Sequence, residues 1–309
     1  MAGVREKNHA ALSASIDDTP QAGVERRLRP RVSGLRLFAI TITVFPFNPF
    51  IGAFACIDDE AALFKERTMD QPKRIALITG GNKGIGLEIA RQLGRAGISV
   101  LLGCRSSERG QQAAEGLRTE GVDAHPVQVD ITDEHSVAHA RQVILDRFGS
   151  LDILVNNAGI NDADDGKPSV ASVDAVRRLL ETNFLGALTV NHAMVPLLRR
   201  APDATIVNMS SSLGSLAMNG DPGSQYYRAQ LIGYNASKAA LNMLTVQLAK
   251  ELAGTRITID SACPGFVDTD LNGHSGTLSV AEGAALPVRL ALMETAVSGQ
   301  FVDARGSVP

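Results

Sequence analysis

Short apolar runs alternate with amphipathic stretches along the chain from residue 73 onward. The apolar runs predict strands, and the stretches with helical spacing predict helices between them. Runs such as 153–155 are apolar throughout, which is typical of strands covered on both faces. The pattern therefore predicts one doubly wound α/β domain with a seven-stranded parallel sheet and helices on both faces. The predicted strands are residues 74–79, 99–103, 125–129, 153–156, 205–209, 258–262 and 300–302, and the predicted helices lie near 84–96, 107–119, 133–148, 173–198, 233–252 and 279–293.

Residues 1–68 do not follow this alternation. An arginine-rich segment, 25–31, precedes an apolar stretch, 37–57, and a charged stretch comes next. The apolar stretch suits a membrane span poorly, because prolines interrupt it and about 20 continuous apolar residues are needed. A signal peptide would also explain basic residues followed by an apolar core. We favour a third interpretation, in which translation starts at Met69 and 1–68 is a disordered or mis-assigned N-terminal extension.

Composition narrows the classes of protein and partner. The chain has 309 residues, of which 44% are hydrophobic, so it can bury a large core. Its formal net charge of −3 gives no electrostatic basis for binding nucleic acid or a membrane surface. The three cysteines, Cys56, Cys104 and Cys263, are widely spaced and odd in number, which favours reduced thiols and a cytoplasmic protein. His135 and His139 share a helix face, but a serine follows the first, where a zinc protease needs glutamate, so we expect no metal site.

A glycine-rich turn joins the first predicted strand to the first predicted helix, and reads Thr79-Gly80-Gly81-Asn82-Lys83-Gly84-Ile85-Gly86. Glycines permit a tight turn and a close approach of the backbone to a pyrophosphate. The helix N-terminus adds amide N–H groups and the positive end of the helix dipole. The turn therefore predicts a dinucleotide site that includes Gly80, Asn82, Lys83, Gly84, Ile85 and Gly86.

The end of the second predicted strand distinguishes NADP from NAD. An acidic residue there would bind the ribose 2′-hydroxyl of NAD, but the chain reads Leu102-Gly103-Cys104-Arg105-Ser106. The planar guanidinium of Arg105 suits a 2′-phosphate, and Lys83 in the glycine turn adds a second cation. The sequence therefore predicts NADP(H).

Tyr234-Asn-Ala-Ser-Lys238 places a phenol and an ammonium on one face of a predicted helix, because residues four apart lie together. A nearby cation favours the phenolate, and so it lowers a tyrosine pKa that is otherwise about 10. Such a pair predicts a proton donor and acceptor that works near neutral pH.

These motifs together resemble the short-chain dehydrogenase/reductase family over residues 73–305. The glycine turn has the family's TGxxxGxG spacing, Asn156-Asn157-Ala158-Gly159 resembles its NNAG motif, and Pro264-Gly265 resembles its PG motif. The resemblance implies a Rossmann fold. It also implies cofactor-binding roles for Asp130 at the adenine, for Asn157, Ala158 and Gly159 beside the cofactor, for Pro264, Gly265, Val267 and Thr269 at the nicotinamide end, and for Tyr234 and Lys238.

The same resemblance implies a catalytic tetrad of Asn183, Ser211, Tyr234 and Lys238. Among three consecutive serines, the family pattern selects Ser211. The implied reaction is hydride transfer to a carbonyl carbon while Tyr234 delivers a proton to the oxygen. Lys238 would lower the tyrosine pKa and bind the nicotinamide ribose, and Asn183 would anchor a water near the lysine.

The chain departs from many relatives in the segment before the tyrosine, since Tyr234 lies 23 positions after Ser211. Carbonyl reductases of the family often carry an insertion there, and their glycine turn resembles this one, Asn82 and Lys83 included. We therefore predict an NADPH-dependent carbonyl reductase acting on a small ketone or aldehyde. An NADP-dependent alcohol or hydroxysteroid dehydrogenase working in the oxidative direction is the alternative, and a non-catalytic NADP-binding sensor is an alternative of another class. Whether the protein is a monomer or a homo-oligomer stays undecided.

Overall fold

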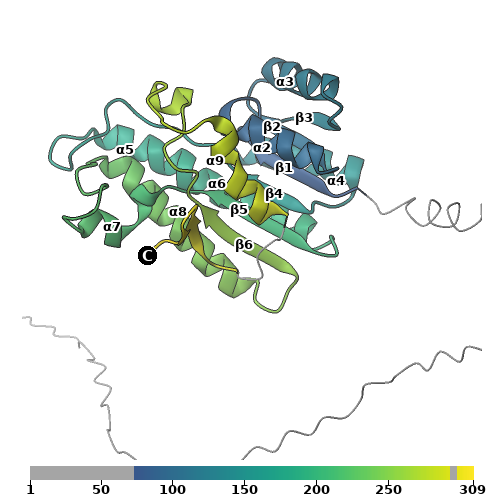
Figure 1. Cartoon of the computed structure of the whole chain (residues 1–309). Helices are drawn as coiled ribbons and strands as arrows, with labels where there is room; N and C mark the ends of the chain where they lie inside the picture. Colours follow the sequence, from purple (N-terminus) through teal and green to yellow (C-terminus); the bar gives the residue numbers. More distant parts are fainter. Residues whose placement is uncertain (1–72, 293–297) are drawn as a thin grey trace, which may run out of the picture. The chain divides into compact units, whose positions relative to one another are not determined.

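In a computed structural model, which describes residues 73–292 and 298–309, eight strands form one sheet in the order β3-β2-β1-β4-β5-β6-β7-β8 (Figure 1). Strands β1 to β7 are parallel, and β8 is antiparallel to β7. The strands are β1 (Ile75–Thr79), β2 (Ser99–Cys104), β3 (Ala124–Gln128), β4 (Ile153–Asn156), β5 (Ala204–Met209), β6 (Ile257–Ala262), β7 (Phe301–Asp303) and β8 (Gly306–Ser307).

The predicted doubly wound α/β fold is confirmed, with one correction to the strand count. All seven predicted strands exist, and β8 is an eighth that pattern reading missed. It has only two residues, which are too few to show a periodic pattern. A tight turn joins it to β7, and in this turn the carboxylate of Asp303 accepts from the amide of Arg305 at 2.8 Å. The central strands are apolar because both of their faces are covered; every residue of β1 is buried.

Helices connect the strands, and their caps follow the sequence. Ser106, Asp133 and Ser172 each accept a hydrogen bond from an amide in the first turn of the helix that follows. The predicted helix 173–198 is instead three segments, α5, a π-helical turn η1 and α6. The helices are α2 (Gly84–Arg95), α3 (Ser107–Thr119), α4 (Glu134–Phe148), α5 (Val173–Leu180), η1 (Glu181–Leu185), α6 (Gly186–Leu198), α7 (Leu216–Gly220), α8 (Ile232–Glu251) and α9 (Val280–Ala291), with short 3-10 turns η2 (Ser212–Gly214) and η3 (Asp270–Asn272).

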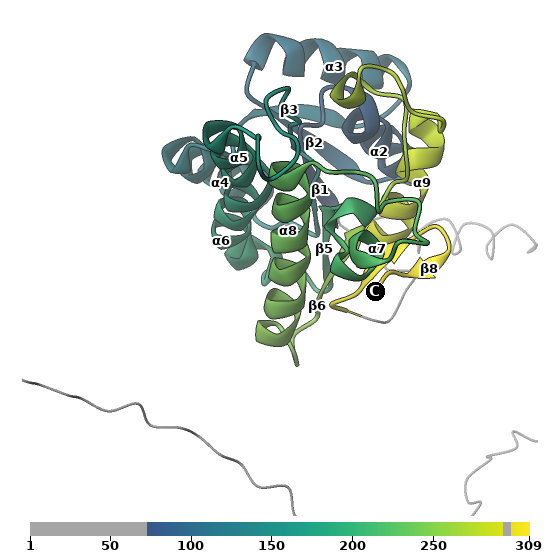
Figure 2. The ribbon, with the colours of Figure 1, turned by 90° about the vertical axis from the view of Figure 1, so that its left-hand side faces the viewer.

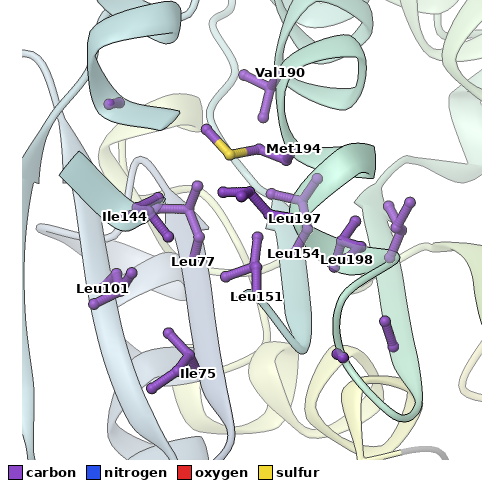
Figure 3. Packing of buried hydrophobic residues seen from close by; sticks show 14 of the residues in the cluster. Ile75, Leu77, Leu101, Ile144, Leu151, Leu154, Val190, Met194, Leu197 and Leu198 are labelled. Carbon is purple, nitrogen blue, oxygen red and sulfur yellow. The ribbon is translucent and has the colours of Figure 1, made fainter. Parts of the chain in front are cut away.

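Two hydrophobic layers hold the helices to the sheet, one on each face. The layer shown in Figure 3 joins the sheet to α4, α6 and α8; Leu77 and Leu101 meet Ile144 and Met194 there. The other layer joins the sheet to α2, α3 and α9. Burying side chains of this size contributes about 1.5–3 kcal/mol each. The sheet is therefore a rigid base for the loops at its ends.

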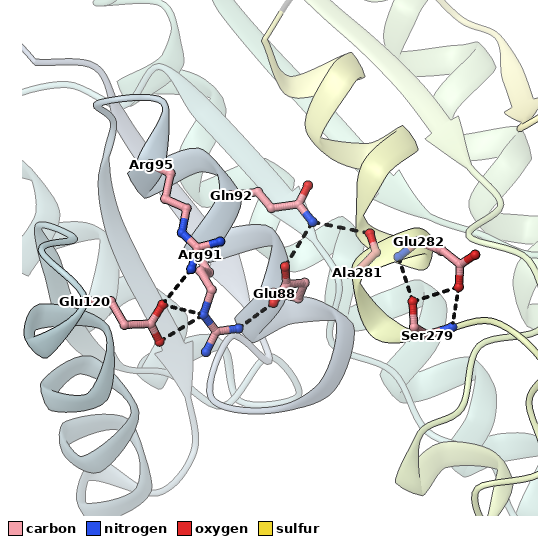
Figure 4. A network of polar contacts seen from close by, with 8 residues as sticks. All are labelled: Glu88, Arg91, Gln92, Arg95, Glu120, Ser279, Ala281 and Glu282. Atoms are coloured by element: carbon pink, nitrogen blue, oxygen red, sulfur yellow. Dashed lines mark hydrogen bonds and ion pairs between the residues drawn. The ribbon is translucent and has the colours of Figure 1, made fainter.

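A polar network fixes α2 on its own face of the sheet (Figure 4). Arg91 lies between Glu88 and Glu120, and its Nε donates to a Glu120 oxygen at 2.9 Å. Gln92 donates to a Glu88 oxygen at 3.0 Å and to the carbonyl of Ala281 in α9 at 3.3 Å. Helix α2 is thus tied to the α3–β3 turn and to α9.

The predictions for the N-terminal part of the chain concern residues that the structure does not describe. The extension 1–68, its apolar stretch 37–57 and the start at Met69 all lie outside the described residues. Among the helices within 73–292 and 298–309, none has both the length and the apolar character needed to cross a membrane.

Candidate active site

The predicted site residues gather at the carboxyl ends of the central strands. Strands β1 and β4 are neighbours, but α2, which follows β1, packs in one hydrophobic layer, while α6, which comes after β4, packs in the other. Such a switch point leaves a crevice beyond the strand ends where open α/β sheets bind ligands. Strands β5 and β6 bring the serine loop and the PG segment to the same edge.

The glycine turn after β1 is tightly packed and leads directly into α2. Gly80 has a φ of 64°, and Gly86 packs so closely that a Cβ on it would lie 2.4 Å from the side-chain nitrogen of Asn157. Helix α2 starts directly after Lys83, and among the described residues no side chain caps its N-terminus and no acid lies in its first turn. Its first amide groups therefore favour an anion at this end of the sheet.

The NNAG segment after β4 braces this turn. The hydroxyl of Thr79 accepts from the amides of Asn157 and Ala158, both at 3.0 Å. The Asn157 side chain donates to the carbonyls of Thr79 at 2.9 Å and Gly80 at 3.3 Å. Gly159 lies deeper, where a Cβ would be 3.7 Å from the ammonium of Lys238. The segment thus connects the glycine turn to the surroundings of Lys238. We call these two parts of the site the phosphate end and the chemical end.

Two cations lie at the phosphate end, and one of them has a partner that the sequence did not reveal. Arg105, directly after β2, is exposed. Lys83 is exposed too, but its ammonium lies 2.6 Å from a carboxylate oxygen of Asp270 in η3. That hydrogen bond is the main cause of the lowered pKa of Asp270, and His274 lies on the other oxygen at 3.0 Å. Asp270 is 187 positions away in the chain. To make the predicted phosphate contact, Lys83 would therefore have to contact the phosphate and Asp270 together, or leave Asp270.

Asp130, for which the resemblance implies an adenine contact, lies at the carboxyl end of β3. It follows β3, and the amide before it at Val129 donates to the carbonyl of Cys104 at 3.0 Å, which aligns the ends of β2 and β3. One carboxylate oxygen of Asp130 accepts from the amide and the hydroxyl of Thr132 at 3.1 and 2.8 Å. The side chain is therefore held in place at the rim.

The PG segment after β6 reaches over to the glycine turn. Gly265 has a φ of 86°, which turns the chain directly after Pro264. Val267 is buried, and its carbonyl accepts from the side chain of Asn272 at 2.8 Å. A Cβ on Gly84 would lie 3.8 Å from the methyl group of Thr269. The two segments are thus in contact range across the N-terminus of α2.

The three serines after β5 have different surroundings. Ser210 is buried and donates to the side chain of Asn242 at 2.6 Å, and Ser212 is buried against the sulfur of Cys263 at 3.2 Å. Ser211 is partly exposed; its oxygen accepts from the amide of Leu213 at 3.2 Å, and its hydroxyl lies close enough to Tyr234 to lower the pKa of that phenol. The serine whose hydroxyl lies beside Tyr234 is therefore Ser211, which is the serine that the resemblance selects.

Asn183 lies in the π-helical turn and is buried there. Its amide oxygen accepts from the amide of Ile160 at 2.8 Å, and its amide nitrogen donates to the carbonyl of Ile160 at 3.1 Å and to the hydroxyl of Ser237 at 3.1 Å. Ser237 in turn donates to the carbonyl of Tyr234 at 2.7 Å. Asn183 is thus a structural link between the loop after β4 and α8.

Tyr234 and Lys238 share one face of α8, with the ammonium 5.6 Å from the centre of the phenol ring. Lys238 is buried and donates to the carbonyl of Met209 at 2.8 Å. Burial lowers the lysine pKa to about 8 and, with the nearby thiol of Cys263, raises the tyrosine pKa to about 12. The sequence predicted a lowered pKa for Tyr234, but the pKa is raised here, because desolvation of the phenolate outweighs the hydrogen bond from Ser211.

The insertion before Tyr234 packs onto the start of α8 through α7, and Figure 2 shows the two helices side by side. The side chain of Asn235 donates to that of Asn219 at 3.0 Å and to the carbonyl of Ala229 at 3.1 Å. A hollow of about 300 Å³ lies between these groups, Tyr227 and Pro168. The insertion thus packs against the first turn of α8, the helix that carries the predicted catalytic residues.

Within the part of the chain that the structure describes, no group of three histidine, cysteine or acidic side chains is placed to hold a metal ion.

Comparison with known proteins adds independent evidence. The family model for short chain dehydrogenase matches residues 74–277. A short-chain dehydrogenase of Penicillium roqueforti is 36% identical over 225 residues, which cover 71% of this chain and 88% of the relative. Carbonyl reductase 1 of Mus musculus, an NADPH enzyme by name, is 32% identical and covers 76% of this chain and 98% of itself. The crystal structure of an NADPH-bound carbonyl reductase from chicken fatty liver superposes with a TM-score of 0.68 at 27% identity, over 77% of this chain and 99% of that one.

Proposed function

This chain belongs to the short-chain dehydrogenase family, and on that premise we propose that it is an NADPH-dependent carbonyl reductase of small ketones or aldehydes. The predicted family and the oxidoreductase class are confirmed by the match and by relatives that are named reductases and dehydrogenases. NADP(H) as the cofactor agrees with the NADPH carbonyl reductases among them. The carbonyl substrate and the roles of individual residues are the content of the proposal.

The crevice fits NADPH on the evidence of its own residues. The uncapped N-terminus of α2 and the braced glycine turn suit a pyrophosphate. Arg105 and Lys83 supply positive charge at the end of β2 and in the turn, where no carboxylate from β2 opposes a 2′-phosphate. Gly265, Val267 and Thr269 would border the nicotinamide end. When bound, the cofactor supplies the hydride.

The observation that carries the proposal is the arrangement of three groups at the chemical end. The hydroxyl of Ser211 and the phenol of Tyr234 lie together, and the ammonium of Lys238 lies on the same helix face. Ser211 would hold the substrate oxygen, and Tyr234 would donate its proton to that oxygen as negative charge develops. A phenol with a pKa of about 12 is protonated at neutral pH, as a proton donor must be.

The oxidative alternative would use the same residues, because the phenol that donates its proton in reduction accepts that proton back in oxidation. The ratio of oxidised to reduced cofactor would set the direction. A non-catalytic NADP-binding sensor would not need a buried lysine beside that phenol, because burying an ammonium is itself unfavourable. The buried lysine therefore supports an enzyme over a sensor.

Tyr234→Phe tests the proposal, because it removes only the proton donor. We expect the turnover of NADPH with a panel of quinones, diones and aromatic aldehydes to fall by about 10²–10⁴-fold. Binding of NADPH, measured by fluorescence or calorimetry, should stay within about twofold, since the phenol oxygen carries the lost function and the ring remains. Tyr226→Phe, on the insertion, is the matched control and should leave turnover unchanged. Wild-type protein that binds NADPH yet reduces nothing in the panel would favour the sensor, and loss of binding in Tyr234→Phe would make the tyrosine structural.

A further inference from the structure

The helix that carries Tyr234 is capped by a residue from another part of the chain. Helix α8 begins at Ile232, and its own N-cap residue, Leu231, offers no side-chain hydrogen bond. Asp165, in the loop between β4 and α5, fills that role. One of its carboxylate oxygens accepts from the amide of Gly233 at 2.8 Å, and the other accepts from the amide of Tyr234 itself at 2.9 Å. A carboxylate there satisfies two helix-end donors and complements the helix dipole.

The loop that presents this carboxylate is held in place on both sides. The amide of Gly166 donates to Asp165 at 2.9 Å, and its carbonyl accepts from the amide of Ile232 at 3.0 Å. Earlier in the loop, Asp162 accepts from Arg178 of α5 at 2.8 Å. The carboxylate of Asp165 therefore has a defined position relative to α5 and the sheet.

The first turn of α8 also packs too tightly to shift freely. A Cβ on Gly233 would lie 2.6 Å from a methyl group of Leu179 in α5 and 3.2 Å from the carboxylate of Asp165. On its other side, the carbonyl of Tyr234 accepts from Ser237, which Asn183 holds. The backbone of Tyr234 is thus fixed at its amide by Asp165 and at its carbonyl by Ser237.

We propose that Asp165 is a positioning residue for the reaction, which sets the location of the Tyr234 phenol by holding the backbone amide of that residue. This inference rests on the proposed role of Tyr234 as proton donor. Asp165 contacts neither substrate nor cofactor in this role; it acts through the first turn of α8. Displacing a reacting group by about 1 Å is enough to cost about 10²-fold in rate.

Asp165→Asn tests this, because the new amide keeps an oxygen for Gly233 but turns an N–H group toward the amide of Tyr234. We expect kcat to fall by about 10- to 100-fold while KM for NADPH stays within about twofold. The primary isotope effect with deuterated NADPH and the solvent isotope effect should both rise, because the misplaced phenol slows the chemical step. Asp164→Asn removes the same charge one position away, from an exposed side chain, and should match wild type in every measurement.

A merely structural role would lower the active fraction and leave both isotope effects unchanged, and that result would overturn the proposal, as would wild-type kcat in Asp165→Asn. If Asp165→Asn does not fold, judged by circular dichroism, Asp165→Glu replaces it. The glutamate keeps the charge and both acceptors but displaces them by one methylene, so a folded variant with wild-type kcat and isotope effects contradicts positioning. Failure of the proposed function looks different, because wild type itself would then show no NADPH turnover.

Discussion

Two lysines of this site, Lys238 at the chemical end and Lys83 at the phosphate end, have opposite environments. Lys238 is 6% exposed and donates to a backbone carbonyl, and burial lowers its pKa to about 8. The side chain of Lys83 is 61% exposed and pairs with Asp270, which is 59% exposed. The same residue type is thus buried beside the proposed proton donor in one place and exposed in an ion pair in the other.

The two ends of the site are held by different kinds of interaction. At the chemical end, desolvation shifts pKa values, and hydrogen bonds that involve Asn183, Ser237 and Asp165 hold the helix. At the phosphate end, exposed ion pairs are worth only about 0–1 kcal/mol and are screened by salt. Changes at the buried end should therefore be severe and insensitive to salt, and changes at the exposed end should be moderate and sensitive to it.

The largest effect should come from Lys238→Met, which removes the buried ammonium. We expect turnover to fall by about 10²–10⁴-fold, because the proton-transfer pair and the proposed ribose contact are lost together. Lys250→Met, at the exposed end of the same helix, should leave turnover unchanged. Steady-state kinetics at two salt concentrations provides the measurement. A loss of turnover of less than about tenfold in Lys238→Met would show that the buried ammonium is not essential for the reaction.

Arg105→Asp should have the next largest effect, at the exposed end. Replacing the guanidinium by a carboxylate should lower the preference for NADPH over NADH by about 10- to 100-fold, since a charged hydrogen bond is worth about 1.5–3 kcal/mol. The ratio of kcat/KM for the two cofactors measures this, and Arg109→Asp, one helical turn away, serves as the comparison. An unchanged ratio would remove Arg105 from the 2′-phosphate site.

The pH dependence should follow Lys238. Its pKa is lowered to about 8, so the ammonium is present below that pH and is lost above it, while a phenol with a pKa of about 12 stays protonated throughout. We expect kcat/KM for reduction to fall about tenfold per pH unit above about 8, as for the loss of one essential proton. A profile that stays flat to pH 10 would show that the charge of Lys238 is not needed.

The smallest effect should come from Asp270→Asn, which frees Lys83 from its ion pair. We expect NADPH to bind about two- to fivefold more tightly at low salt, in line with the modest energy of an exposed pair, and the gain to fade at high salt. Asp268→Asn removes a neighbouring carboxylate that contacts His274 rather than Lys83, and so it controls for net charge. Weaker NADPH binding in Asp270→Asn would show that this acid orients Lys83 instead of competing for it.

Much of the fold was predictable because its signals are local. Apolar runs, glycine turns and serine or aspartate caps act within a few residues, so seven strands and most helix bounds follow from pattern alone. The π-helical turn at Glu181–Leu185 did not follow, and its buried Asn183 is hydrogen-bonded to Ile160 and Ser237, which are distant in sequence. Strand β8 is too short to carry a pattern.

The sequence by itself determined which residues meet at the site, because parallel strands bring the turns that follow them to one edge of the sheet. Only the tertiary structure decided how those residues are held and charged. Burial, not the i,i+4 spacing, sets the pKa values of Tyr234 and Lys238, and contacts across the fold pair Lys83 with Asp270 and Asp165 with the amide of Tyr234. Desolvation and long-range hydrogen bonds depend on atoms from every neighbouring segment, and no local pattern records them.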